Sequence, residues 1–317
     1  MSAQLSGILF QLFQSLLVVV IAPLLLGWVN QCRAWLQNRT GAGVLQPYRT
    51  LRKLFHKDAV IAYNASPLFR VTPYILFSCM WLAAGVVPML ATDLPFSPAA
   101  DVIALVGIFA LARVFIALAA MDIGTSFGTM GARREMLVAF LAEPALLMVF
   151  FTASLISHST QLPTIVEALA HTQFALYPSM AFAAIAFVMI LLAENARIPV
   201  DNPSTHLELT MIHEAMILEY SARHLALIEW ASSIKLLAYT TIGFALFVPY
   251  GIAEAGNWAA LPLALAALGI KLVAAGAGLA LLETISAKMR IFRAPEFLGT
   301  AFLLAVLGML IHFLLGA

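Results

Sequence analysis

Long apolar stretches recur along almost the whole of this 317-residue chain, and they constrain its fold more than any other feature. About 20 residues of α-helix are needed to cross the roughly 30 Å hydrocarbon layer of a membrane. Hydrophobic residues make up 62% of the chain and charged residues 10%, a balance that excludes an ordinary soluble domain. The sequence predicts an all-α integral membrane protein, a single polytopic domain over residues 1–317, with about eight transmembrane helices. We expect the spans near residues 8–29, 72–91, 102–120, 136–156, 178–193, 234–252, 259–282 and 298–315.

Connections that carry several lysines and arginines alternate with connections that carry none. The basic connections lie near residues 30–71, 121–135, 194–233 and 283–297, and the others near 92–101, 157–177 and 253–258. By the positive-inside rule the basic connections face the cytoplasm. We therefore expect a multi-pass protein of the cytoplasmic (inner) membrane with both termini outside. The long first loop, 30–71, and the acidic third loop, 194–233, then form a cytoplasmic working surface.

The composition also limits the chemistry that the chain can carry. Its only cysteines are Cys32 and Cys79, too few for the four thiolates of an iron–sulfur cluster. His213 and Glu214 are followed by Ile217, where a zinc-protease helix needs its second histidine. The basic residues are spread along the chain rather than clustered between aromatic residues, which excludes a nucleic-acid interface. We expect no metal and no other cofactor bound by this chain.

Ionisable side chains inside the predicted spans are the first candidate functional residues. Arg113, Glu143 and Lys271 lie there, and such groups are costly enough that they usually face the protein interior and take part in function. Glu135 precedes Glu143 by eight residues, so on a straight helix both lie near one face, about 12 Å apart along the axis. They can form two stations of one proton path. The alternative is that Glu135 pairs with a loop base such as Arg134, and Glu143 with a neighbouring helix.

The third internal loop concentrates further candidates. Asp201 or Asn202 is a suitable helix N-cap, and Pro203 suits the first helical position, so we expect an amphipathic helix after them. Glu194 and Arg197 are close enough in sequence to pair. Between residues 194 and 220 the acids and histidines are Glu194, Asp201, His206, Glu208, His213, Glu214 and Glu219.

Several of these segments together resemble one family. They are Asn38–Gln46, the turn Gly131–Glu135, the pair Glu143-Pro144, the run from Glu194 through Arg197 to Asp201, the run Glu219-Tyr220-Ser221, and Glu283 with Ala287. In this order they resemble the respiratory complex I subunit 1 family. Within it the chain is most similar to the membrane subunits of group 4 nickel–iron hydrogenases.

The residue pattern and the resemblance together give two sets of candidate residues. The ion-coupling set is Glu135, Glu143, Glu194, Asp201, Glu208, Glu214, Glu219, Lys271 and Glu283. The set for docking an electron-transfer arm, or for a quinone-like chamber, is Arg39, Gly43, Gln46, Arg134, Arg197, His206 and His213. Imidazoles exchange protons near neutral pH, so the two histidines can relay protons.

The resemblance implies the membrane-anchor and ion-coupling subunit of a formate hydrogenlyase- or hydrogenase-4-like complex, moving protons or sodium ions. Its implied partners are hydrogenase-like large and small subunits with iron–sulfur proteins, antiporter-like membrane subunits and the lipid bilayer. The nickel–iron and iron–sulfur centres would lie in those partners. Two alternatives stay open: a quinone-chamber subunit 1 of respiratory complex I, with quinone as ligand, and an independent ion transporter. The chain departs from the family pattern at Thr40, Ala42, Ser204 and His206, which favours the hydrogenase type.

Overall fold

The computed structural model describes residues 2–92, 94–171, 177–201, 211–253 and 260–315, and within them the chain is helical without a β-strand. Two short 3-10 helices are η1 (Ser97–Ala99) and η3 (Ile291–Arg293). The α-helices are α1 (Ser2–Leu36), α2 (Gln46–Phe55), α3 (Pro67–Val86), α4 (Val102–Asp122), α5 (Ser126–Ser157), α6 (Leu162–His171), α7 (Pro178–Glu194), α8 (His213–Ile217), α9 (Ala222–Phe247), α10 (Leu261–Ile285) and α11 (Ala294–Leu315).

Seven of the described helices are long and apolar enough to cross a membrane: α1, α3, α4, α5, α9, α10 and α11. Helix α7 is also apolar but has 17 residues. At about 1.5 Å per residue it is about 26 Å long, slightly shorter than the hydrocarbon layer of roughly 30 Å. With α7 as a shorter eighth crossing, the predicted all-α membrane fold of about eight helices is confirmed.

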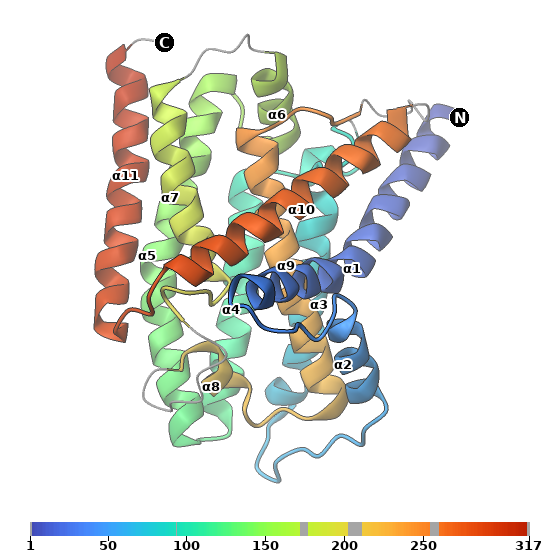
Figure 1. Ribbon diagram of the computed structural model, residues 1–317, viewed down its shortest axis with the longest axis vertical. Coiled ribbons are helices and arrows are strands. Elements are labelled where there is room, and N and C mark those ends of the chain that lie inside the picture. Colours follow the sequence, from blue (N-terminus) through green and yellow to red (C-terminus); the bar gives the residue numbers. More distant parts are fainter. Residues whose placement is uncertain (1, 93, 172–176, 202–210, 254–259, 316–317) are drawn as a thin grey trace.

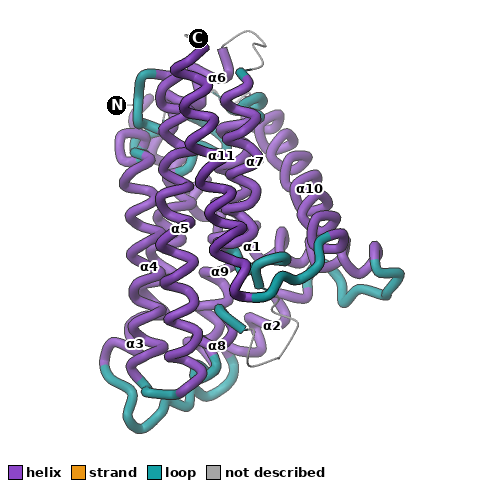
Figure 2. Tube along the Cα trace, turned by 90° about the vertical axis from the view of Figure 1, so that its left-hand side faces the viewer, coloured by secondary structure: helices purple, strands orange, loops and turns teal. Residues whose placement is uncertain are grey.

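Helix α9 is the central helix of the bundle. Of its most apolar stretch 67% is buried, against 22% for α11 at the periphery. Helices α5, α7 and α11 pack side by side, and α3 lies between α4 and α9 (Figures 1 and 2). Helices α1 and α10 pack against each other and cross the bundle obliquely, with α10 in front of α9 in Figure 1.

Both chain ends lie at one end of the bundle (Figure 1), as an even number of crossings requires. Helices α2 and α8 lie at the opposite end. We call this the basic end, because it holds α2 and the connections 37–45, 56–66 and 286–293. On α2, Leu51 is buried while Arg52 and Lys53 are exposed. Such a short amphipathic helix suits the boundary between the bundle and water.

Helices α5 and α9 begin much earlier than the hydropathy pattern predicts, at Ser126 and Ala222. Thr125 caps α5, its hydroxyl accepting from the Gly128 backbone N–H at 3.3 Å, so the predicted turn Gly131–Glu135 is helical. Helix α9 begins at Ala222, inside the range predicted as the third loop. A hydropathy window finds only the part of a helix inside the apolar layer. Helix α5 has 32 residues and, at about 1.5 Å each, runs for about 48 Å, well beyond that layer.

The helix expected after Asp201 falls on residues 202–210, outside the described residues. The described helix in this loop is the five-residue α8. One Asp201 carboxylate oxygen accepts hydrogen bonds from the backbone N–H groups of Ile212 (3.3 Å) and His213 (3.2 Å), which fixes the start of α8. A side chain at Gly131 would place its Cβ 2.9 Å from the Ile212 carbonyl oxygen, so the glycine lets this segment pack closely on α5.

Candidate functional site

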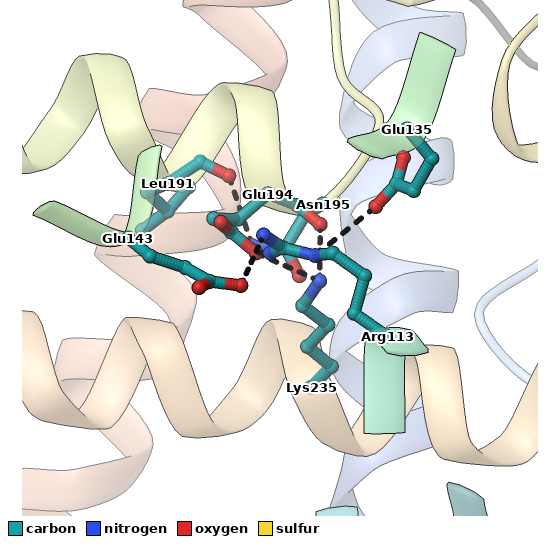
Figure 3. A network of polar contacts seen from close by, with 7 residues as sticks. All are labelled: Arg113, Glu135, Glu143, Leu191, Glu194, Asn195 and Lys235. Atoms are coloured by element: carbon teal, nitrogen blue, oxygen red, sulfur yellow. Dashed lines mark hydrogen bonds and ion pairs between the residues drawn. The ribbon is translucent and has the colours of Figure 1, made fainter. Parts of the chain in front are cut away.

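Arg113 of α4 is the centre of a buried charge cluster. Its side chain is 3% exposed and meets three carboxylates from two other helices (Figure 3). Nη1 is 3.0 Å from Glu143 Oε1, and Nε is 3.3 Å from Glu135 Oε1, both on α5. Nη2 donates directly to Glu194 Oε2 at the end of α7. A guanidinium suits this position, because its planar fork offers five N–H donors.

Lys235 of α9 joins the same cluster through Glu194. Its Nζ is 2.9 Å from Glu194 Oε2 and donates to the Glu194 backbone carbonyl at 2.7 Å. The Asn195 side-chain amide donates to the Leu191 carbonyl at 2.9 Å. The bond from Lys235 satisfies the carbonyl at the end of α7, where a cation is favourable. We call Arg113, Glu135, Glu143, Glu194 and Lys235 the central cluster.

The central cluster has more acids than bases. Two cations face three carboxylates, so with every group ionised the cluster carries one net negative charge. An uncompensated charge in a low-dielectric interior is costly, and a proton shared among the carboxylates relieves that cost. The exposed fraction of the side chain rises from 0% at Glu194 through 14% at Glu135 to 31% at Glu143. Glu143 is therefore the most accessible carboxylate for proton exchange.

A small cavity lies beside the central cluster. Its volume is about 60 Å³, and Arg113, Glu135, Glu194, Lys235 and His213 are among its lining residues. Glu194 Oε1 and Asn195 Oδ1, which belong to the same lining, have no hydrogen-bond donor among the described atoms. A cavity of this size with polar partners can hold water. His213, the first residue of α8, thus lines the same cavity as the cluster.

A second ion-pair cluster surrounds Glu283 at the end of α10. One Glu283 oxygen accepts from Arg197 Nη1 at 3.1 Å, and the other from Arg33 Nη1 at 3.4 Å. Burial lowers the pKa of the Arg197 guanidinium, and the facing Glu283 carboxylate opposes that shift. We call Arg33, Arg197 and Glu283 the Glu283 cluster. It ties α1, α10 and the connection after α7 together.

The segment 194–201 connects these clusters. Glu194 belongs to the central cluster and Arg197 to the Glu283 cluster, so they do not pair with each other as their spacing suggested. Asp201, 2% exposed, lies 3.9 Å from Lys288 Nζ and accepts the two bonds at the start of α8. Three of the predicted candidate residues on this short segment thus have different ion-pair partners.

Lys271, predicted for the ion-coupling set, lies elsewhere. Its Nζ donates to the carbonyls of Val248 (2.7 Å) and Tyr250 (2.6 Å), just after the end of α9. Among the described ion pairs it has no carboxylate partner. This geometry is that of a cation that caps helix-end carbonyls.

Three of the seven residues predicted for arm docking lie exposed at the basic end. Arg39, Gly43 and Gln46 are exposed on the first loop. Gly43 has a φ of +91°, a conformation that favours glycine, and its N–H donates to Gln31 Oε1 at 3.0 Å. Arg134 instead points inward and donates to the Met211 carbonyl at 2.8 Å.

Four more predicted residues belong to the acidic third loop. Glu219 is exposed, and Glu214 is half-buried on α8. Glu208 and His206 lie outside the described residues. Among the described residues no group of three or more histidines, cysteines and acids is arranged to hold a metal ion.

Sequence reasoning missed Lys235 and Arg33 as members of the two clusters. Lys235 falls at the start of a predicted span, and a lysine at such a position could have been recognised as a candidate from the sequence. Arg33 follows the first span and reads as an ordinary interfacial anchor. Only the contact with Glu283 gives it a carboxylate partner among the described residues.

Comparison with known proteins decides the family. A family model described as NADH dehydrogenase matches residues 9–314, nearly the whole chain. The chain belongs to the NADH dehydrogenase subunit 1 family. The resemblance predicted from the sequence motifs is thereby confirmed.

The relatives of this chain include two proteins from Escherichia coli (strain K12). Formate hydrogenlyase subunit 4 is 31% identical over 296 residues, covering 93% of this chain and 95% of the relative. Hydrogenase-4 component C is 33% identical over 248 residues, covering 78% and 77%. An NADH-quinone oxidoreductase subunit from Rickettsia bellii is 27% identical over 206 residues, covering 64% and 60%.

The fold has a solved counterpart. A chain of the membrane-bound sulfane sulfur reductase, an archaeal respiratory membrane complex, superposes with a TM-score of 0.81. The match covers 98% of this chain and 99% of that one at 18% sequence identity, so it establishes the fold alone. The chain is therefore a multi-pass membrane protein of the NADH dehydrogenase subunit 1 family, related to membrane subunits of hydrogenase-like and complex I-like respiratory complexes.

Proposed function

We propose that this chain is the membrane-anchor and ion-coupling subunit of a formate hydrogenlyase- or hydrogenase-4-like complex. The observation that carries the proposal is the central cluster, in which Arg113 holds three carboxylates beside a small cavity. Ion-coupling chemistry needs carboxylates that gain and lose a proton inside the membrane. A cluster with one carboxylate more than its cations meets that need.

The docking surface of this proposal is the basic end. The exposed Arg39 and Gln46 of the first loop would contact the electron-transfer arm, and Glu219 would contact it from the third loop. We expect this end to face the cytoplasm, because it carries the basic connections. The nickel–iron and iron–sulfur centres would belong to the partner subunits.

Energy transfer would run through the segment 194–201. A movement of the arm, or a change in its charge on reduction, would displace this segment. The segment carries Glu194, Arg197 and Asp201. A displaced Glu194 changes the charge balance around Arg113, and a carboxylate such as Glu143 then takes up or releases a proton. Antiporter-like partners would receive the change laterally and move protons or sodium ions.

The extent of similarity favours the hydrogenase type over the alternative, a quinone-chamber subunit of respiratory complex I. The match to formate hydrogenlyase subunit 4 covers 93% of this chain at 31% identity. The match to the Rickettsia bellii NADH-quinone oxidoreductase protein covers 64% at 27% identity. Because of that second match, a complex I subunit remains the alternative that the experiment below must distinguish.

The test is a purification through a tag on this chain in mild detergent. Mass spectrometry identifies the co-purifying subunits, and assays measure nickel and hydrogen evolution from a reduced dye. Nickel with hydrogen evolution is the expected result. An iron–sulfur arm that lacks nickel and reduces quinone would assign the chain to complex I, and ion transport by the isolated chain would overturn both.

A further inference from the structure

An apolar groove, with no residue of either charge cluster in its lining, lies between α1, α7, α9 and α10. Its volume is about 310 Å³, and its lining includes Leu25, Phe187, Phe244 and Leu279. The one hydroxyl in the lining, on Thr240, already donates to the Leu236 carbonyl at 2.7 Å. No side-chain donor in the described lining is therefore left to orient a polar ligand, and a hydrocarbon chain suits it.

The groove opens on the outer surface of the bundle. Three of its lining residues are substantially exposed: Val188 by 40%, Val248 by 42% and Leu282 by 41%. They come from α7, the end of α9 and α10, and Figures 1 and 2 show α10 inclined away from the upright α7. A groove on this surface meets the acyl chains of the bilayer.

The size of the groove limits its occupant. A groove of about 310 Å³ has room for part of a single hydrocarbon chain. A transmembrane helix is about 10–12 Å across with its side chains and is far too wide. One hydrocarbon chain fits.

Positive charge lies at the basic end of this groove. Val29 lines it and precedes Arg33 by one helical turn on α1, and Leu279 precedes Glu283 by one turn on α10. Because residues four apart share a helix face, the Glu283 cluster continues the groove toward the basic end. Two arginines face one carboxylate there, which leaves one net positive charge.

Arg33 is the accessible cation of that cluster. Its side chain is 23% exposed, against 9% for Arg197. Its Nη1 meets Glu283 at 3.4 Å and its Nη2 meets Asn30 Oδ1 at 3.3 Å. A guanidinium has five N–H donors, so donors remain for a phosphate.

We propose that this groove is a binding site for an anionic phospholipid. One acyl chain fills the groove, and the phosphate of the headgroup pairs with Arg33. Basic pockets between transmembrane helices on the side of the basic loops suit such headgroups. The site does not depend on the proposed ion-coupling function, because it uses no residue of the central cluster.

The test uses the complete complex, purified through this chain and placed in nanodiscs of defined lipid. Photoactivatable phosphatidylglycerol and phosphatidylcholine, each with a diazirine on one acyl chain, are added in separate samples, and labelled peptides are mapped. Phosphatidylglycerol is expected to label α7, α9 and α10 at the groove about fivefold more than phosphatidylcholine. Equal labelling by the two lipids, or no labelling at the groove, would overturn the proposal.

Two variants separate the chain and headgroup contributions. A side chain at Gly278 would meet nothing within 4 Å and lies in the groove, so Gly278→Leu is expected to block it and remove most labelling. Gly107→Leu on α4 also enters open space, lies outside the groove lining, and should leave labelling unchanged. Arg33→Gln should keep labelling but abolish the preference for phosphatidylglycerol. Undiminished labelling in Gly278→Leu, or displacement of the label by added quinone, would contradict a phospholipid site.

Discussion

Glu194 and Arg197 are three residues apart, yet their side chains enter different ion-pair clusters. Helix α7 ends at Glu194, so the chain turns before Arg197 and sends the two side chains to different helices. Glu194 is held by Arg113 and Lys235, and Arg197 by Glu283. A displacement of this connection therefore changes both clusters at once.

Glu143→Gln is expected to lower coupled ion transport while the complex still assembles and the arm still reacts. The amide keeps the size of the side chain but cannot ionise, so the most accessible carboxylate of the central cluster is lost. Transport is measured in proteoliposomes with a pH-sensitive dye, beside hydrogen evolution. Glu167→Gln, exposed on α6, is the matched control and should behave as wild type. Unchanged transport in an assembled Glu143→Gln complex would remove this residue from the path.

Arg113→Gln is expected to destabilise the protein strongly. Three carboxylates then lose their shared cation, and breaking a buried ion pair costs about 3–5 kcal/mol. The double variant Arg113→Gln with Glu194→Gln should recover about 1–3 kcal/mol of the lost stability. In this variant one buried carboxylate is removed together with its cation, so it is not left unpaired. Thermal unfolding in detergent measures both. If Arg113→Gln unfolds no earlier than Arg49→Gln, on the exposed face of α2, the cluster contributes little to stability.

Arg39→Ala and Asp201→Ala are both expected to weaken the arm, but by different routes. Arg39 is exposed, so its loss should reduce retention of the arm without changing the melting temperature of this subunit. Asp201 is buried and holds the N–H groups of Ile212 and His213, so its loss should first lower the melting temperature. Pull-down of the arm and thermal unfolding distinguish the routes. Wild-type retention and turnover in both variants would exclude a docking role.

Lys271→Gln tests whether this residue belongs to the ion path. Its ammonium donates to the carbonyls of Val248 and Tyr250 and lies 5.8 Å from the centre of the Phe244 ring. We expect a loss of about 1–3 kcal/mol in stability from the weakened bonds. Transport per assembled complex should stay at the wild-type rate in the same proteoliposome assay. A loss of coupled transport as large as that of Glu143→Gln would show that Lys271 takes part in ion coupling.

Asp101 gives a pH-dependent contribution to stability. It caps α4, accepting from the N–H groups of Ile103 (2.8 Å) and Ala104 (3.3 Å). The Thr160 hydroxyl, which donates at 2.6 Å, is the largest cause that lowers the pKa of Asp101 in the folded protein. Because the folded pKa is lowered, the ionised Asp101 stabilises the folded protein at pH values above the unfolded pKa of about 3.9. This stabilisation is lost as the pH falls through the folded pKa.

The comparison for this prediction is Asp101→Asn, which keeps the cap but has no charge to lose. Wild type should be the more stable protein at pH 6, and the two unfolding curves should converge below about pH 4. Urea or thermal unfolding at each pH measures the difference. A constant gap between the two proteins down to pH 3 would show that the Asp101 charge contributes nothing.

Hydropathy was enough to predict the membrane fold, because each span must bury its backbone in hydrocarbon. It could not predict where α5 and α9 begin. The polar residues Arg133, Arg223 and Glu229 fall in the helical parts that continue beyond the apolar runs. Capping by Thr125 and tertiary packing decide those boundaries.

The site was predictable only in part for a similar reason. Helical spacing places Glu135 and Glu143 near one face, and both do reach Arg113. Spacing within one helix does not tell which helices are neighbours, so it could not pair Lys235 with Glu194 or direct Lys271 to carbonyls. Those contacts come from the packing of α9 against α7 and α10.

The shortness of α7 has a consequence for membrane voltage. Because α7 has only 17 residues and is shorter than the hydrocarbon layer of roughly 30 Å, we expect Glu194 at its end to lie within that layer. A full crossing by one elementary charge is worth about 2.3 kcal/mol per 100 mV. A proton that reaches the central cluster from the basic end crosses only a fraction of that potential. Proton occupancy of the cluster should then follow the pH on that side closely and the voltage weakly.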